Sequence, residues 1–82
     1  MIRVIAVMPV GEGWTVRSEP FDNEMMFLSG AKAEAAARRM GSTIAKGGET
    51  AEIRIFLRDG ALAARFICPP QADGGALRSA AG

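Results

Sequence analysis

The stretch Glu52–Ile67, EIRIFLRDGALAARFI, places two short runs rich in apolar residues on either side of Asp59 and Gly60. An Asp-Gly pair between two such runs is a strong short-range signal for a β-hairpin. The sequence therefore predicts two antiparallel strands here, joined by a two-residue loop at Asp59-Gly60.

The loop sets the register of the predicted hairpin. A two-residue loop pairs Arg58 with Ala61, and the ladder then brings Arg54 opposite Arg65. Like charges directly opposite each other destabilise a sheet, so the facing arginines need an explanation. The other predicted pairs are Leu57 with Leu62, Ile55 with Ala64 and Ile53 with Phe66.

The two faces of this hairpin differ in character. One is apolar throughout and is expected to be buried, with Ile53, Ile55, Leu57, Leu62, Ala64 and Phe66. A slip of one residue would turn Arg65 onto that face, so burial should fix the register. The arginines are then expected on the outer face, where water screens their charge. The outer face carries Glu52, Arg54, Phe56, Arg58, Ala61, Ala63, Arg65 and Ile67.

Length and composition limit the functions that the chain can have. With 82 residues it is expected to form one small domain. Ten basic and nine acidic residues give a formal net charge of +1, so there is no overall attraction to nucleic acid or to an anionic membrane. The chain has no His, and its one Cys, Cys68, excludes an intrachain disulfide and a thiolate zinc cluster. No cofactor is predicted.

The single free thiol suits a reducing cytoplasm, which is the predicted location. The N-terminal stretch is apolar but short, and Gly11 and Glu12 interrupt it. No transmembrane span or signal peptide is therefore expected there.

Three further strands are predicted ahead of a helix. Ile2–Met8 and Trp14–Glu19 alternate as strands do, and Glu24–Leu28 is a short apolar run that could also be a buried link. Pro9 is expected to weaken pairing at the end of the first strand.

The helix is expected between Ser29, which can cap its N-terminus, and Gly47, which can end it. Its apolar stripe is mostly alanine, so the helix should lie close against the sheet. Gly41 weakens a helix by about 1 kcal/mol relative to Ala, which makes a break there the main alternative. The stripe consists of Ala33, Ala36, Ala37, Met40 and Ile44. The side of the helix that is expected to face solvent carries Lys32, Arg38, Arg39, Ser42 and Lys46.

These elements predict an α+β fold. We expect an antiparallel sheet of four to five strands with one long helix packed on one face, in the chain order strand-strand-(strand)-helix-strand-strand. The domain should span residues 1–68. Residues 69–82, rich in Pro, Gly and Ala, are predicted to form a flexible tail.

Three segments together resemble a family of small bacterial domains of unknown function. They are GWTVRSE, AKAEAAARRM and EIRIFLRDGALAARF, spanning about Gly13 to Arg65. The matching positions are Gly13, Trp14, Val16 and Arg17, then Ala33, Glu34 and Ala35, then Arg58, Asp59 and Gly60. The chain departs from the family pattern at the helix entry, FLSGAK, and in its apolar first strand. The resemblance carries no activity, cofactor or ligand to this chain.

Few residues suggest a chemical site. Trp14 could stack on a ligand, but burial in the core is favoured. Phe56 between Arg54 and Arg58 is a weak pattern for binding nucleic acid or another anion. Cys68 has no residue nearby in sequence that would activate it, so a passive position at a strand end is expected. The acidic residues show no metal-ligand spacing. The sequence does not predict an enzyme.

The outer sheet face is predicted to be more apolar than a solvated face, with Ile5 and Val7 of the first strand added to the hairpin residues. Such a surface usually contacts another copy or a partner protein. We therefore expect a homodimer, or binding to a protein partner. Binding of nucleic acid or an anion, and an enzyme whose site forms only on assembly, remain alternatives. The candidate interface or anion-binding residues are Arg54, Phe56, Arg58, Arg65 and Ile67.

Overall fold

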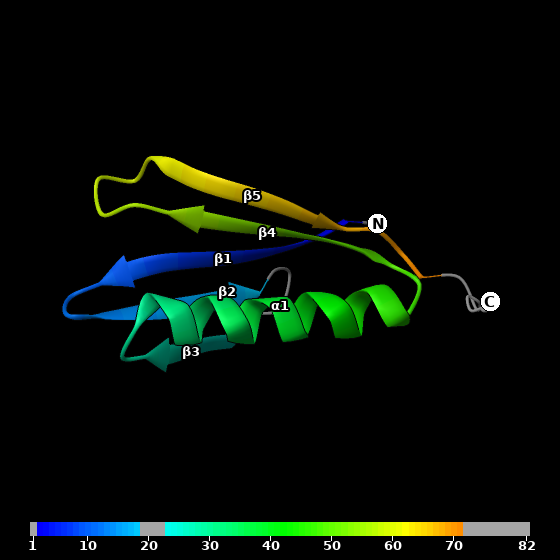
Figure 1. The fold of residues 1–82 in the computed structure, drawn as a ribbon, viewed down its shortest axis with the longest axis horizontal. Helices are drawn as coiled ribbons and strands as arrows, with labels where there is room; N and C mark the ends of the chain where they lie inside the picture. The colour runs from blue at the N-terminus through cyan, green and yellow to red at the C-terminus, as the bar shows by residue number, and fades with distance from the viewer. Residues whose placement is uncertain (1, 19–22, 72–82) are drawn as a thin grey trace.

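The computed structural model describes residues 2–18 and 23–71. The chain forms a five-stranded sheet with one helix against one face, which confirms the predicted α+β class (Figure 1). The strand order across the sheet is β3-β2-β1-β4-β5. The elements are β1 (Ile2–Val10), β2 (Gly13–Ser18), β3 (Asn23–Phe27), α1 (Gly30–Lys46), β4 (Thr50–Phe56) and β5 (Leu62–Cys68).

The sheet is mixed, so the prediction of a purely antiparallel sheet is wrong. β1 pairs with β4 in parallel at the centre, while β1–β2, β2–β3 and β4–β5 are antiparallel. The cause is the crossover through α1. Short links reverse the chain between neighbouring antiparallel strands, whereas a helix carries it back to start in the same direction. β4 therefore enters beside β1 and runs the same way.

The predicted helix is confirmed at both ends. The Ser29 hydroxyl accepts a hydrogen bond from the Lys32 backbone N–H at 3.2 Å, and Gly47 ends the helix. The helix does not break at Gly41, which is buried within it. The alanines of the apolar stripe face the sheet as expected, and Ala45 is buried with them at the last turn.

The core lies between α1 and the middle strands. Ala33 and Ala37 are fully buried and bring the helix close to the strands. Trp14 also lies on this side, where its ring contacts Gly30, so the core interpretation of Trp14 is supported. The buried apolar cluster consists of Ile5, Val7, Val16, Ala33, Ala37, Ala51 and Ile53.

The predicted positions of Ile5 and Val7 on the outer face are wrong. Both are buried under α1, and Val4 and Ala6 occupy the outer side of β1. β1 is apolar on both sides, so its own pattern cannot tell which side meets the helix. Pairing with β4 decides it, because Ile5 lies beside Ile53 on the helix side.

The hairpin loop also differs from the prediction. It has three residues instead of two: the Leu57 N–H donates to the Ala61 carbonyl at 2.8 Å, and Gly60 has a φ of 90°. The Asp59 carboxylate accepts a hydrogen bond from the Ala61 N–H at 2.9 Å. A three-residue loop with glycine in the left-handed conformation is a common hairpin connection. The predicted pairs Arg58–Ala61 and Leu57–Leu62 are therefore wrong.

A register shift between Ile55 and Phe56 corrects the offset that the longer loop introduces. Leu62 consequently pairs with Phe56 and is half exposed, as is Leu57, although both were predicted in the core. Beyond the shift the predicted register is confirmed. The confirmed pairs are Ile55 with Ala64, Arg54 with Arg65 and Ile53 with Phe66.

β1 extends two residues beyond its predicted end at Met8. The pairing of β1 with β4 ends at Val7, whereas its pairing with β2 continues to Val10. Pro9 therefore has a neighbouring strand on one side only, which a residue without an N–H tolerates. The predicted second strand reached Glu19, which lies outside the described residues. Of the predicted tail, residues 69–71 are described, and the Gln71 N–H donates to the Ala45 carbonyl at 2.8 Å. Residues 72–82 lie outside the description.

The alanine stripe can be tested with matched substitutions. Ala37→Leu should lower the free energy of unfolding by about 1–3 kcal/mol, because the added carbons have no room under the helix. Ala35→Leu makes the same change on the exposed side and should alter stability by less than about 0.5 kcal/mol. Urea unfolding followed by circular dichroism measures both. Equal losses would mean that the wrong side of α1 has been assigned to the sheet.

Gly41 lies close against the sheet in the middle of α1. A Cβ at this position would lie 2.9 Å from the Cys68 Sγ and 3.3 Å from the Ile53 Cδ1. Glycine is therefore used in mid-helix for space, although it costs about 1 kcal/mol in helix propensity.

A double-mutant cycle separates these two effects of Gly41. The change in the free energy of unfolding caused by Gly41→Ala should be about 1 kcal/mol more favourable in a Cys68→Ala background than in the native chain. The reason is that Cys68→Ala removes the sulfur atom that blocks the new methyl group. Urea unfolding of the four proteins gives this coupling energy. A coupling below about 0.3 kcal/mol would contradict the close contact.

Candidate functional site

The sheet face opposite α1 has no helix or strand packed on it within residues 2–18 and 23–71 (Figure 1). We call it the open face. Strand alternation and the pairing register place its side chains in rows that run across the sheet. Its largest members are Ile2, Val4, Met8, Val10, Arg17, Glu24, Met26, Glu52, Arg54, Phe56, Leu62, Arg65 and Ile67.

The first row of the open face is apolar and lies toward the hairpin loop. Met26, Thr15 and Met8 are paired across β3, β2 and β1, and Phe56 and Leu62 continue the level on β4 and β5. Met26 is 63% exposed and Leu62 50%. Thr15 is fully buried between its neighbours, and its hydroxyl has no hydrogen-bond partner among the described residues. This row presents apolar side chains to solvent at both edges of the sheet.

The second row is charged. Arg17, Ala6, Arg54 and Arg65 are paired in sequence across β2, β1, β4 and β5, and Glu24 lies at the β3 end, opposite Arg17. Three guanidinium groups therefore lie along one line of the open face. Beyond it, toward the start of β1, Val4, Glu52 and Ile67 form a third row.

Glu52 explains how the sheet tolerates the facing arginines. Its Oε2 lies 2.6 Å from the Arg54 Nε and 3.9 Å from the Arg65 Nε. The Glu52 side chain is only 9% exposed, whereas those of Arg54 and Arg65 are 42% and 59% exposed. One shielded carboxylate thus lies beside both cations.

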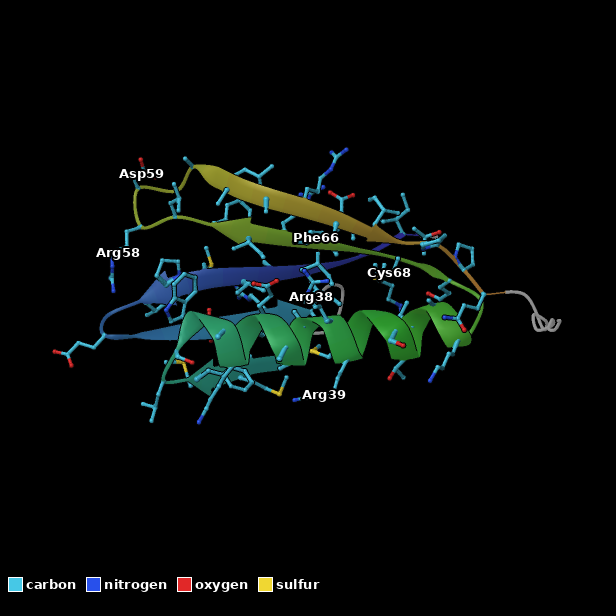
Figure 2. All side chains as sticks on the ribbon, viewed as in Figure 1. Arg38, Arg39, Arg58, Asp59, Phe66 and Cys68 are labelled. Carbon is cyan, nitrogen blue, oxygen red and sulfur yellow. The ribbon has the colours of Figure 1, made fainter. Side chains whose placement is uncertain are left out.

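The structure places four of the five predicted site residues together. Arg54, Phe56, Arg65 and Ile67 share the open face. Arg58 does not, because the three-residue loop carries it away from the strand (Figure 2). Its Nη1 instead donates to the Gly11 carbonyl at 2.8 Å, which ties the hairpin loop to the β1–β2 turn. The prediction that Arg58 lies on the outer face is wrong.

Cys68 lies on the helix side of β5 and is half buried against Gly41 (Figure 2). It is the last residue of β5, the strand-end position expected from the sequence. Among the described residues, no three side chains of His, Cys, Asp or Glu gather as a metal ion would require. Within the same residues, no helix is long and apolar enough to cross a bilayer.

The sequence did not predict a cleft that lies on the helix side of the sheet, where α1 passes over β3. We call it the α1–β3 cleft; its volume is about 570 Å³. Helix residues spaced by three and four form one wall. The only sequence signal for it is that Arg39, predicted on the solvent side, neighbours the apolar stripe. The lining residues are Arg3, Ser18, Met25, Phe27, Ala36, Arg39, Met40, Thr43 and Ile44.

No family model, curated protein or solved structure matches this chain. The resemblance to a bacterial family of small domains therefore stays a prediction.

The role of Glu52 can be tested by removing its charge. Glu52→Gln should lower the free energy of unfolding by about 1–2 kcal/mol, a value reduced from that of a fully buried pair because both arginines are partly exposed. Raising NaCl from about 0.05 to about 1 M should recover part of the loss by screening the two arginines.

The matched control for Glu52→Gln is Glu34→Gln, which breaks an exposed pair with Arg38 on α1. It should change stability by less than about 0.5 kcal/mol. A loss in Glu52→Gln that does not respond to salt would show that repulsion between Arg54 and Arg65 is not the cause.

Proposed function

We propose that this domain is a non-enzymatic interaction module that forms a homodimer through its open face. The observation that carries the proposal is a five-stranded sheet with a helix on one face, and half-exposed apolar side chains on the other face with no helix or strand over them among residues 2–18 and 23–71. Large exposed apolar patches mark interaction sites, and isolated sheets with one bare apolar face are prone to pair. We place the domain in the cytoplasm, where a free Cys68 thiol persists.

A second copy fits the edges of this face, which carry opposite charges, while Arg17 would lie over Arg54 of the partner copy, whose charge Glu52 offsets. β1 is the middle strand of the sheet. A two-fold axis along β1 would therefore bring β3 of one copy over β5 of the other. Sheets that pack face to face keep their strands roughly aligned in this way. In the charged row, Glu24 would then meet Arg65 of the partner copy.

The same axis matches the apolar row. Met26 of one copy would face Leu62 of the other, and Met8 would lie near the axis. Both Met26 and Leu62 are half exposed or more in the single chain, so this contact would remove apolar surface from water at two symmetric places. Methionine adapts its shape easily to a partner surface.

The alternative is binding of nucleic acid along the charged row. The alignment of Arg17, Arg54 and Arg65 favours it. Two observations weigh against it. Glu52 and Glu24 offset two of the three positive charges, and Phe56 is the one aromatic residue on the described part of the open face, whereas sheets that bind single strands stack bases on several.

The dimer can be tested by light scattering or sedimentation at micromolar concentrations. The native chain should sediment as a dimer, and Phe56→Glu should sediment as a monomer because it buries a charge in the apolar row. Ile67→Glu should also sediment as a monomer. Because Ile67 is half exposed in the single chain, this second variant shows that dissociation does not result from misfolding. Ala35→Glu adds the same charge on the exposed side of α1 and should remain dimeric. A monomeric native chain overturns the proposal.

A charge swap tests the two-fold axis. Arg65→Glu and Glu24→Arg should each raise the dimer dissociation constant roughly tenfold, and the double variant should recover most of the loss. Arg54→Glu alone should weaken the dimer only modestly. Salt-dependent retention on a heparin column that Arg54→Glu abolishes, with dimerisation unchanged, would favour the nucleic-acid alternative instead.

A further inference from the structure

The α1–β3 cleft has the size and lining of a small-molecule site. Binding pockets for small ligands commonly have volumes of about 300–1,000 Å³ and mostly apolar walls with a few polar groups. The α1–β3 cleft has a volume of about 570 Å³. Its apolar walls come from β3 and from one side of α1. They are formed by Met25, Phe27, Ala36, Met40 and Ile44.

The cleft exists because α1 is too narrow to cover the sheet. Ala33 and Ala37 hold the helix close over the central strands, so the side of α1 that faces β3 stands over a gap. Methionines from both sides line that gap, and their flexible side chains can adapt to a guest molecule.

Arg39 supplies the charge at this site. It lines the cleft from the side of α1 opposite Arg38 (Figure 2). Among residues 2–18 and 23–71, its guanidinium has no hydrogen-bond or ion-pair partner. Arg38, its neighbour in sequence, is instead paired with Glu34 at 2.8 Å and lies 4.5 Å from the centre of the Phe66 ring.

The second cation of the cleft, Arg3, donates its Nε–H to Glu49 at 2.9 Å. The described lining residues include Arg3 and Arg39 and no carboxylate. A guanidinium binds a carboxylate through two parallel hydrogen bonds, so an anionic head group matches the charge. The half of the lining that is apolar would then hold a hydrocarbon chain.

We propose that the α1–β3 cleft binds a small amphipathic carboxylate of the fatty-acid class, with its chain between Met25 and Met40 and its carboxylate on Arg39. Binding does not depend on the homodimer, because the cleft and the open face lie on opposite sides of the sheet.

The probe is sodium decanoate below its micelle concentration, added to the full chain labelled with ¹⁵N. Amide shifts should concentrate at the cleft, at Ser18, Ala36 and Met40, and leave the open face unchanged. Decanol, which has the same chain and no charge, should bind roughly tenfold more weakly. Decyl phosphate tests whether another anionic head group can replace the carboxylate, and the proposal expects it to bind no more tightly than decanoate.

Arg39→Gln should weaken decanoate binding roughly tenfold and leave decanol binding unchanged, whereas Arg38→Gln, on the other side of α1, should keep decanoate affinity within about twofold. Both positions are exposed, so each variant should fold. Circular dichroism is the check on folding. Shifts at Phe56 or Ile67 in place of the cleft, equal binding of decanol, or equal loss in the two arginine variants would each overturn the proposal. Equal binding of decanol, or equal loss in the two arginine variants, leaves the homodimer proposal unaffected, because sedimentation tests the homodimer separately.

Discussion

The close approach of one small-residue helix to the sheet is the constraint on which this fold depends. Ala33, Ala37 and Gly41 follow one another at intervals of four residues along α1 and place the helix backbone near β1 and β4. The contact at Gly41 leaves no room for even a methyl group. This proximity buries the isoleucines and valines of the middle strands, which supply most of the hydrophobic stabilisation of a domain of this size.

The same helix sets what the domain leaves uncovered. Five strands spaced about 4.8 Å apart are about 19 Å wide, whereas a helix with its side chains is about 10–12 Å across. α1 therefore cannot cover the whole width of this face from β3 to β5. On the β5 side, Arg38 extends over Phe66 and widens the cover. On the β3 side the α1–β3 cleft remains, and the whole opposite face has no cover at all among the described residues.

The open face balances two requirements on one set of strands. It needs charge to remain compatible with water in the single chain, and it carries apolar residues that a partner could bury. Glu52 makes this combination stable, because one shielded carboxylate serves two arginines that the register brings together. The charged row thus lies between the apolar row of Met26 and Leu62 and a third row in which Val4 and Ile67 lie on either side of Glu52.

The sequence by itself determined the elements that depend on local patterns. The helix limits follow from Ser29 and Gly47, and the inner register of the hairpin, including Arg54 opposite Arg65, follows from alternation and from burial of one face. These features are set by neighbours a few residues away, and their physics is contained in the segment itself.

Only the tertiary structure decided the rest. Whether Ile5 or Val4 faces the helix depends on which strand pairs with β1, and the parallel β1–β4 pairing depends on the crossover through α1. The three-residue loop uses Gly60 in the left-handed conformation, and a register shift between Ile55 and Phe56 compensates for the extra residue. The alternation of apolar residues does not predict such a shift. The α1–β3 cleft arises from the mismatch in width between helix and sheet, which is a property of their packing and not of either sequence segment.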